Sequence, residues 1–136
     1  MEDAIRWCLS EPRTWAVVGC SPSPNRDSQR IAGLLMRNAH RVIPVNPDAD
    51  EVLGERCYPA LDAVPEQVDV VDLFRRSDAA GQHVDEAIAI GARAVWLQLG
   101  VIDHNAAERA RSAGLHVVMD RCPAIELPRL KPRERA

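Results

Sequence analysis

A short polar loop between an apolar run and an amphipathic stretch carries the side chains best suited to chemistry. The apolar run at residues 15–18 stops at Gly19, and polar side chains follow at Ser21, Arg26 and Ser28. We expect Ser28 to cap a helix that begins there. A strand, a tight turn and a helix N-terminus offer backbone N–H groups and a positive dipole end to a phosphate. The loop therefore predicts an anionic ligand of the nucleotide type. It holds only one glycine of a G-x-G-x-x-G motif, so it does not choose the nucleotide.

Alternating apolar and amphipathic segments must position this loop. Five apolar runs predict strands, at residues 14–19, 41–46, 68–74, 94–100 and 115–120. Helical periodicity predicts helices between them, at residues 3–9, 28–38, 60–64, 78–91 and 104–113. Gly91 and Gly114 follow the last two helices in the position that favours a left-handed residue. Pro44 is awkward inside the second strand, because proline cannot donate to a ladder. The pattern predicts an α/β fold, with five parallel strands in a doubly wound sheet and three α/β/α layers.

Length and composition fit a single domain over residues 1–136, with its core at 12–130 and a frayed tail from Pro128. Hydrophobic residues make up 46% and charged residues 27%, which is ordinary for a globular protein. The net charge of −3 gives no electrostatic case for binding nucleic acid or membranes. The first residues do not resemble a signal peptide, and no stretch is apolar enough to span a membrane. We therefore expect a cytoplasmic location.

The cysteines at positions 8, 20, 57 and 122 form no C-x-x-C pair, and the histidines do not cluster near them. The spacing therefore predicts no metal site and reduced, mostly buried thiols. Cys122 lies between Arg121 and Pro123, where a neighbouring cation favours a reactive thiolate. No histidine adjoins it in sequence, so we interpret it as structural or ligand-lining, with a nucleophile as the alternative. Without a clear nucleophile and base, the sequence argues against catalysis but leaves it open.

In parallel sheets the ligand lies beyond the carboxyl ends of the strands. Each residue there therefore has either a structural role or a role in binding the ligand. Asn46 fits turn chemistry before Pro47 or a ribose contact, and Gln98 fits a structural hydrogen bond or a ligand contact. Trp96 fits the core better than a ligand platform. Asp72, inside the third strand, fits a capping or loop-tethering role.

Five motifs in order carry a resemblance: VVGCSPSPNRDS, PVNP, VDVVDLFRR, VWLQLG and VVMDRCP. They resemble the small stand-alone CoA-binding proteins of bacteria, which are related to the CoA-binding domain of the succinyl-CoA synthetase α subunit. The resemblance covers residues 12–130. It implies a Rossmann-like fold that binds the ADP part of CoA or acyl-CoA over the switch point of the sheet.

The resemblance also implies roles for individual residues. The phosphate turn and the following helix start would comprise Gly19, Cys20, Ser21, Arg26 and Ser28. At the end of the second strand, Val45, Asn46 and Pro47 would flank the adenosine. After the third strand, Phe74, Arg75 and Arg76 would cover the adenine or offer charge to a phosphate. The fourth strand and its exit would contribute Trp96, Gln98 and Gly100, and the pantetheine arm would lie nearer Met119, Arg121 and Cys122.

The chain departs from the family pattern at two places. Ala39 and His40 stand where relatives commonly have Gly-Tyr, so the helix must end through Asn38 or another left-handed residue. Leu127 stands where a histidine is common, which puts a role for the C-terminal segment in doubt. Neither change touches the phosphate turn.

Three classes of function compete. The first is a CoA- or acyl-CoA-binding protein without chemistry of its own, for which the resemblance argues. The second is an NAD(P)-binding oxidoreductase domain. Such a domain usually has a carboxylate at the end of the second strand, which binds the ribose hydroxyls. In this sequence Asn46 and Pro47 occupy that place, and Asp48 and Asp50 come only after them. The third is a scaffold or regulatory subunit of a larger enzyme. A protein partner or a homodimer stays open in each case.

Overall fold

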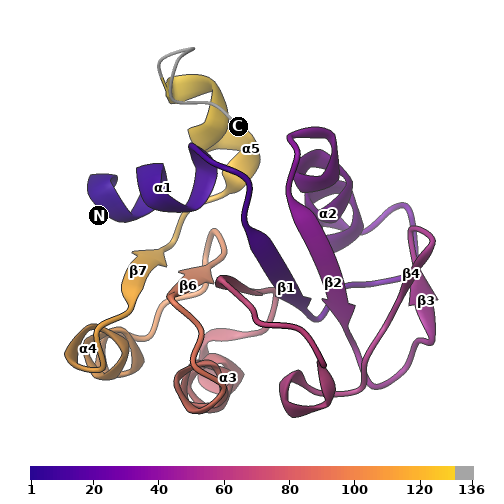
Figure 1. Ribbon diagram of the computed structural model, residues 1–136. Coiled ribbons are helices and arrows are strands. Elements are labelled where there is room, and N and C mark those ends of the chain that lie inside the picture. The colour runs from indigo at the N-terminus through magenta and orange to yellow at the C-terminus, as the bar shows by residue number, and fades with distance from the viewer. Residues whose placement is uncertain (131–136) are drawn as a thin grey trace.

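The computed structural model describes residues 1–130, and its centre is a sheet of parallel strands (Figure 1). The sheet consists of β1 (Thr14–Val18), β2 (Arg41–Val45), β5 (Val70–Leu73), β6 (Ala94–Leu97) and β7 (His116–Met119). The spatial order is β2-β1-β5-β6-β7. Counted along the chain within this sheet, the order is 2-1-3-4-5, a doubly wound order whose switch point lies between β1 and β5.

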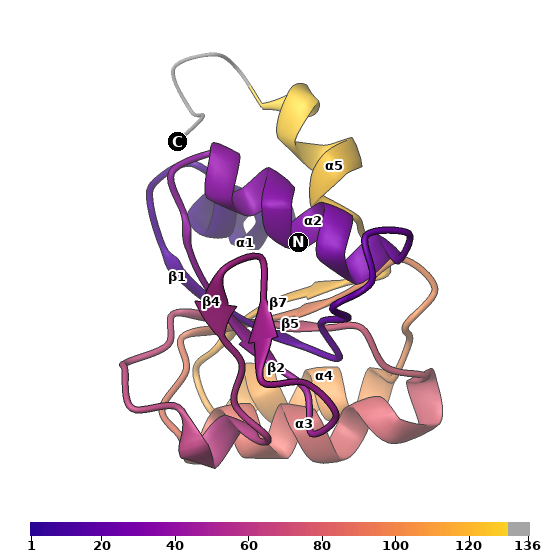
Figure 2. The same cartoon turned by 90° about the vertical axis from the view of Figure 1, so that its right-hand side faces the viewer.

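Helices cover both faces of the sheet (Figures 1 and 2). One face carries α1 (Glu2–Leu9), α2 (Asp27–Arg37) and α5 (Pro123–Glu126), and the other carries α3 (Ser77–Ala89) and α4 (His104–Ser112). Alternate strand residues serve the two faces, as a pleated strand requires. Trp15 and Val17 pack with α1 and α2, whereas Ala16 and Val18 pack in the cluster under α3 and α4. The predicted three-layer, Rossmann-like fold is confirmed.

Proline is tolerated in β2 because this strand lies at the edge of the sheet. Pro44 pairs with Val17 of β1, but its carbonyl points outward and accepts from the N–H of Tyr58 at 3.1 Å. The missing N–H therefore belongs to the outer side of the strand. The ladder to β1 loses no hydrogen bond there.

The connection after β2 holds a hairpin that the sequence analysis missed. Strands β3 (Glu51–Val52) and β4 (Glu55–Arg56) pair antiparallel around Leu53 and Gly54, whose φ values are +52° and +78°. Two positive φ values suit the tight turns that connect hairpins. The short helix predicted at 60–64 is present as the single 3-10 turn η1 (Leu61–Ala63).

The ends of two segments differ from the prediction. Helix α2 begins at Asp27, so Ser28 lies inside the helix and is not its N-cap. Its C-terminus uses Ala39 in the left-handed region, with φ +70°, while Asn38 Nδ2 donates to the Leu34 carbonyl at 2.8 Å. This is one of the two solutions that the missing glycine left open.

The C-terminal segment folds beyond the last strand instead of fraying from Pro128. Helix α5 starts with Pro123, a residue favoured at the first helical position. It continues into the 3-10 turn η2 (Leu127–Arg129), and Leu127 packs in the core with α1 and α2. The rest of the predicted tail, residues 131–136, lies outside the described residues. No helix within residues 1–130 is both long and apolar enough to cross a bilayer.

Candidate ligand site at the switch point

The exits of β1 and β5 approach each other closely at the switch point. Gly19 N donates to the Val45 carbonyl at 2.8 Å, and Phe74 N donates to the Val18 carbonyl at 2.9 Å. A Cβ on Gly19 would lie 2.5 Å from the Phe74 carbonyl oxygen, and the φ of Gly19 is +83°. Both the backbone conformation and the close approach therefore require glycine here.

Ser28 fixes the loop in front of α2 instead of capping the helix. Its Oγ accepts from the N–H of Ser21 at 2.9 Å, and the Oγ of Ser21 accepts from the N–H of Ser23 at 3.0 Å. Ser28 is buried, so this hydrogen bond is shielded from water. We call residues 19–28 the phosphate loop, after the ligand group that the sequence predicts for it. Together with nearby residues it surrounds a cavity of about 610 Å³, lined by Gly19, Ser21, Asn25, Arg26, Asp27, Ser28, Arg30, Asn46 and Phe74.

Asn46 uses both ends of its side-chain amide to hold the loops together. Its Nδ2 donates to the Cys20 carbonyl at 3.0 Å, and its Oδ1 accepts from the N–H of Asp48 at 2.9 Å. The second bond is the turn chemistry expected before Pro47. Cys20 itself is fully buried, and burial raises the pKa of its thiol to about 12. Cys20 therefore belongs to the scaffold of the loop.

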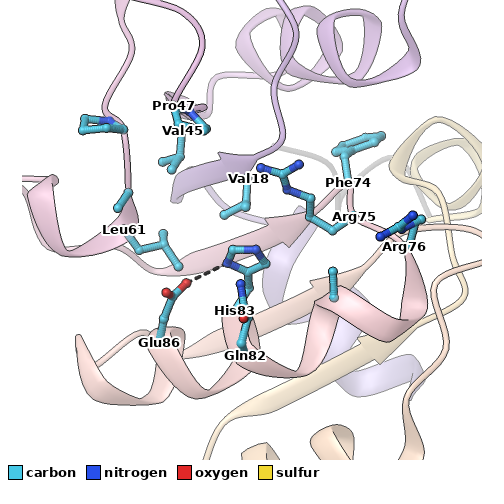
Figure 3. A pocket seen from close by; sticks show the side chains of 13 residues that line it. Val18, Val45, Pro47, Leu61, Phe74, Arg75, Arg76, Gln82, His83 and Glu86 are labelled. Atoms are coloured by element: carbon cyan, nitrogen blue, oxygen red, sulfur yellow. Dashed lines mark hydrogen bonds and ion pairs between the residues drawn. The ribbon is translucent and has the colours of Figure 1, made fainter.

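A second cavity, of about 630 Å³, lies between the end of β2, the exit of β5 and helix α3 (Figure 3). Apolar side chains line the part near β1, β2 and η1, whereas polar side chains from α3 line the part opposite them. The lining comprises Val18, Val45, Pro47, Pro59, Ala60, Leu61, Phe74, Arg75, Arg76, Ala79, Gln82, His83 and Glu86. Of these, the sequence analysis named only Val45, Pro47, Phe74, Arg75 and Arg76 as site residues. It missed the polar side chains Gln82, His83 and Glu86 because it treated α3 only as a covering helix.

A third cavity, of about 590 Å³, opens on the α2 side of Phe74. Its lining is mostly apolar and comprises Asp27, Arg30, Ile31, Leu34, Arg37, Phe74, Arg75, Gln98, Leu99, Val101, Cys122 and Ala124. Gln98 is only 6% exposed, and its Oε1 accepts no hydrogen bond from any of residues 1–130. Of the two readings of Gln98, the structural hydrogen bond is not observed among these residues.

The two arginines after β5 differ. Arg75 borders both the second and the third cavity, and its guanidinium forms no hydrogen bond or ion pair with the part of the chain that the structure describes. Figure 3 shows its side chain reaching over the second cavity toward Val18. Arg76 is 86% exposed at its side chain and lies 3.4 Å from Asp78. Arg75 is therefore the better placed of the two to meet an anion.

Five of the predicted site residues, namely Cys20, Trp96, Gly100, Met119 and Arg121, line none of these three cavities. Trp96 is fully buried, and its Nε1 donates to the Arg121 carbonyl at 2.9 Å. Gly100 N donates to Asp120 Oδ1 at 2.7 Å, and Met119 Sδ accepts from Asp103 N at 3.4 Å. These residues shape the loops around the cavities.

Asp72 corrects a different expectation, because its side chain caps and tethers nothing within residues 1–130. It is fully buried between Val17 and Trp96 in the sheet, and both carboxylate oxygens lack a partner among residues 1–130. Burial raises the pKa of this carboxyl well above its ordinary value. A protonated side chain avoids placing a charge in the core.

The three cavities meet at Phe74, which lines each of them. One cavity is bounded by the phosphate loop and the N-terminus of α2, which suits phosphate groups. The second combines apolar walls with a few polar side chains, and the third is mostly apolar. Residues 1–130 hold no group of three His, Cys, Asp or Glu side chains placed for a metal ion. This arrangement suits a ligand with a base, phosphates and an extended arm.

Comparison with known proteins identifies the family of the chain. The uncharacterized protein YneT of Bacillus subtilis is 31% identical over 118 residues, which cover 87% of each chain. A hypothetical protein from Pyrococcus horikoshii shares the fold with a TM-score of 0.89 and 38% identity, over 96% of this chain and 92% of that one. The acetate–CoA ligase [ADP-forming] I of Archaeoglobus fulgidus is 26% identical over 84% of this chain, which spans only 18% of the ligase. Residues 13–128 match the family described as CoA binding domain. The chain is therefore a member of the CoA binding domain family, as the resemblance had predicted.

Proposed function

We propose that this protein binds CoA or acyl-CoA through the ADP part of the ligand, without chemistry of its own. The observation that carries the proposal is the meeting of three cavities of different character at Phe74. CoA likewise consists of a purine nucleotide, a pyrophosphate and an amide-containing arm. Family membership and the shared region of an ADP-forming acetate–CoA ligase support the same ligand.

The pyrophosphate is proposed to lie against the phosphate loop. The N-terminus of α2 directs its free N–H groups there, and Arg26 stands immediately before the helix. Arg75 follows Phe74 at the exit of β5, lines the two neighbouring cavities and has no competing partner in residues 1–130. A guanidinium that is not already paired is able to form a charge-assisted hydrogen bond with a phosphate.

The arm is proposed to follow the third cavity. Gln98 and Cys122 line this cavity together with the apolar side chains Leu34, Leu99 and Val101. The orphaned Oε1 of Gln98 leaves an unmet hydrogen-bond requirement in a nearly buried side chain. Rotation of the side-chain amide toward the cavity would allow it to accept from an amide N–H of the arm.

A nicotinamide dinucleotide is the weaker alternative. Its adenosine ribose is usually held by a carboxylate at the end of the second strand. Asn46 stands at that position, and both ends of its amide are engaged with the backbone. The third cavity is also mostly apolar, which suits a pantetheine arm better than a second nucleotide.

Titration calorimetry with CoA, acetyl-CoA, NAD, NADP and ADP tests the proposal. We expect binding of CoA and acetyl-CoA, weaker binding of ADP, and none of NAD or NADP. A ligand at 100 times its Kd stabilises the fold by about 2.7 kcal/mol, so thermal unfolding gives an independent readout. Binding of NAD or NADP alone would overturn the proposal, and so would the absence of binding by every ligand.

Two loop variants locate the site. Ser21→Asp and Arg26→Glu both place negative charge beside the proposed phosphates, so each should weaken CoA binding while leaving the fold intact. Arg111→Glu is the matched control, because Arg111 is equally a surface arginine but lies on α4, away from the three cavities. Unchanged CoA affinity in both loop variants would remove the phosphate loop from the proposed site.

A further inference from the structure

The α3 side of the second cavity carries a histidine that is held in one orientation. His83 lines the cavity, and its side chain is only 16% exposed. Its Nδ1 lies 2.7 Å from Oε1 of Glu86, one turn further along α3. Figure 3 shows the imidazole facing the cavity beneath Val18 and Arg75, with Glu86 at its outer side.

This contact determines which ring nitrogen carries the proton. A carboxylate oxygen is only an acceptor, so Nδ1 must be the donor in a hydrogen bond to Glu86. In the neutral imidazole the other nitrogen, Nε2, then keeps a lone pair and acts as an acceptor. Figure 3 shows that nitrogen on the side of the ring away from Glu86, toward Arg75 and the interior of the cavity. The cavity is therefore furnished with an acceptor in a fixed position.

We propose that His83 recognises the 6-amino group of a purine bound in this cavity and disfavours 6-oxopurines. The inference rests on the proposed function, because it takes the base of the CoA nucleotide to occupy the second cavity. The exocyclic N–H of adenine donates to Nε2, whereas the 6-oxygen of hypoxanthine or guanine brings a second acceptor against it. Glu86 acts as a positioning residue that holds the required tautomer.

The burial of His83 distinguishes this role from simple helix stabilisation, although Glu86 is 46% exposed. The pair between Arg111 and Glu108 has the same i, i+3 spacing, and its side chains are 50% and 71% exposed. His83 is instead packed into a concavity whose opposite walls are Val18, Val45 and Leu61. An apolar slot with one directed polar group is the usual form of a specific small-molecule site.

The experiment compares CoA with its deaminated analogue, in which hypoxanthine replaces adenine and all phosphates and the arm are unchanged. Titration calorimetry at one fixed pH compares the two ligands under the same conditions. We expect the wild-type protein to bind CoA about tenfold more tightly than deamino-CoA, as one unmet hydrogen bond implies. The His83→Phe variant should bind CoA and deamino-CoA with about equal affinity, since phenylalanine preserves an aromatic ring but has no hydrogen-bond acceptor.

Further variants separate recognition from structure. His83→Gln restores an acceptor oxygen and should recover part of the preference, whereas Glu86→Leu should reduce it by releasing the imidazole. His104→Phe makes the same substitution at an exposed histidine that lines none of the three cavities, and it should leave the tenfold ratio unchanged.

The possible results distinguish the purine inference from the proposed CoA binding. Equal affinities for CoA and deamino-CoA in the wild-type protein would overturn the role of His83 while leaving CoA binding intact. A preference that survives in His83→Phe would do the same. Failure of the wild-type protein to bind either compound would overturn the proposed function, and the purine inference with it.

Discussion

The two edges of the central sheet treat their basic and aromatic side chains differently. At the edge formed by the amino ends of the strands, these groups bind one another. The Arg13 guanidinium lies 3.8 Å from the centre of the Trp7 ring, and its Nε donates to the Trp7 carbonyl at 2.9 Å. His116 stacks on the same ring with centroids 4.6 Å apart. His40 Nδ1 accepts from Arg13 N at 3.1 Å and from Trp15 Nε1 at 3.2 Å.

At the edge formed by the carboxyl ends, Arg76 and His83 pair with neighbouring carboxylates, but other polar and basic groups are left open. Arg26 and Arg75 form no side-chain hydrogen bond or ion pair within residues 1–130, and Oε1 of Gln98 has no partner there. The three cavities also lie at this edge. Groups that pair with one another contribute to folding, whereas groups that stay unpaired beside a cavity remain available to a ligand. The contrast supports the ligand site proposed at this edge.

The largest expected effect is at Gly19, at the carboxyl edge, where a positive φ and a close backbone contact both require glycine. A glycine with a positive φ but no close contact serves as the comparison. Gly19→Ala should destabilise the fold by about 3 kcal/mol, through left-handed strain and a clash with the Phe74 carbonyl. Gly54→Ala is the matched control, because Gly54 also has a positive φ but no atom within 4 Å of an added Cβ. Denaturant unfolding should show a clearly smaller loss for Gly54→Ala. Equal losses would mean that the close approach carries no cost.

The next effect concerns pH at the amino edge. Burial lowers the pKa of His40 from 6.5 to about 4. The unfolded chain therefore takes up a proton below pH 6.5 that the folded chain does not, and stability falls as the pH drops from about 6.5 to about 4. This group accounts for up to about 3 kcal/mol of the loss. Urea unfolding at pH 7 and pH 4.5 measures it.

His40→Asn supplies the reference for that slope, because its Oδ1 is an acceptor that does not titrate. The other titratable groups affect both proteins equally, so the difference between the two proteins isolates His40. We expect the wild-type protein to lose about 2 kcal/mol more than the variant between the two pH values. Parallel pH profiles would show that His40 is not neutral for the reason given.

A pair of arginine substitutions tests the contrast itself. Arg75→Ala should weaken CoA binding by tenfold or more, as expected for a lost charge-assisted hydrogen bond, while changing the free energy of unfolding by less than about 0.5 kcal/mol. Arg13→Ala should instead cost about 1–2 kcal/mol of stability and leave CoA affinity unchanged, because its stacking and hydrogen bonds are internal. Calorimetry and urea unfolding on both variants suffice. A reversal of the two patterns would contradict the comparison.

The smallest effect lies where α2 ends and the chain turns toward the amino edge. Ala39 adopts φ +70°, which costs an alanine more than a glycine. Ala39→Gly should therefore stabilise the fold by about 0.5–1 kcal/mol, after allowing for the greater freedom of glycine in the unfolded chain. Ala113→Gly is the control, because Ala113 ends α4 with a negative φ of −84° and should lose stability. Thermal unfolding resolves both shifts.

Much of the fold was predictable because its signals are local. Apolar runs and helical periodicity located the five strands of the sheet and its longer helices, and Gly91 and Gly114 do follow the ends of α3 and α4 with positive φ. The elements that the prediction missed also have local signals in the sequence, and these were overlooked. Gly54 marks the β3–β4 turn, and Pro123 after Cys122 marks the start of α5.

The candidate site was only partly predictable. The phosphate loop and Phe74, Arg75 and Arg76 were identified because they directly follow strands, whose carboxyl ends must meet at one edge. Ser28 was predicted to be the N-cap of its helix, which is wrong. Its hydroxyl instead accepts a hydrogen bond from Ser21, seven positions earlier in the chain. His83 and Glu86 gave no sign beyond an ordinary i, i+3 spacing on a helix surface.

The sequence by itself determined the succession of the five sheet strands and the four longer helices along the chain, the glycine turn after β1 and the family. These depend on residues close together in the chain or on motifs in order. Only the tertiary structure decided that Phe74 joins three cavities, that Asp72 is buried without a partner and that His83 faces a cavity. Each of these depends on elements far apart in the chain that pack together. Packing of η1 opposite α3 closes the second cavity, and no periodicity in either segment records its partner.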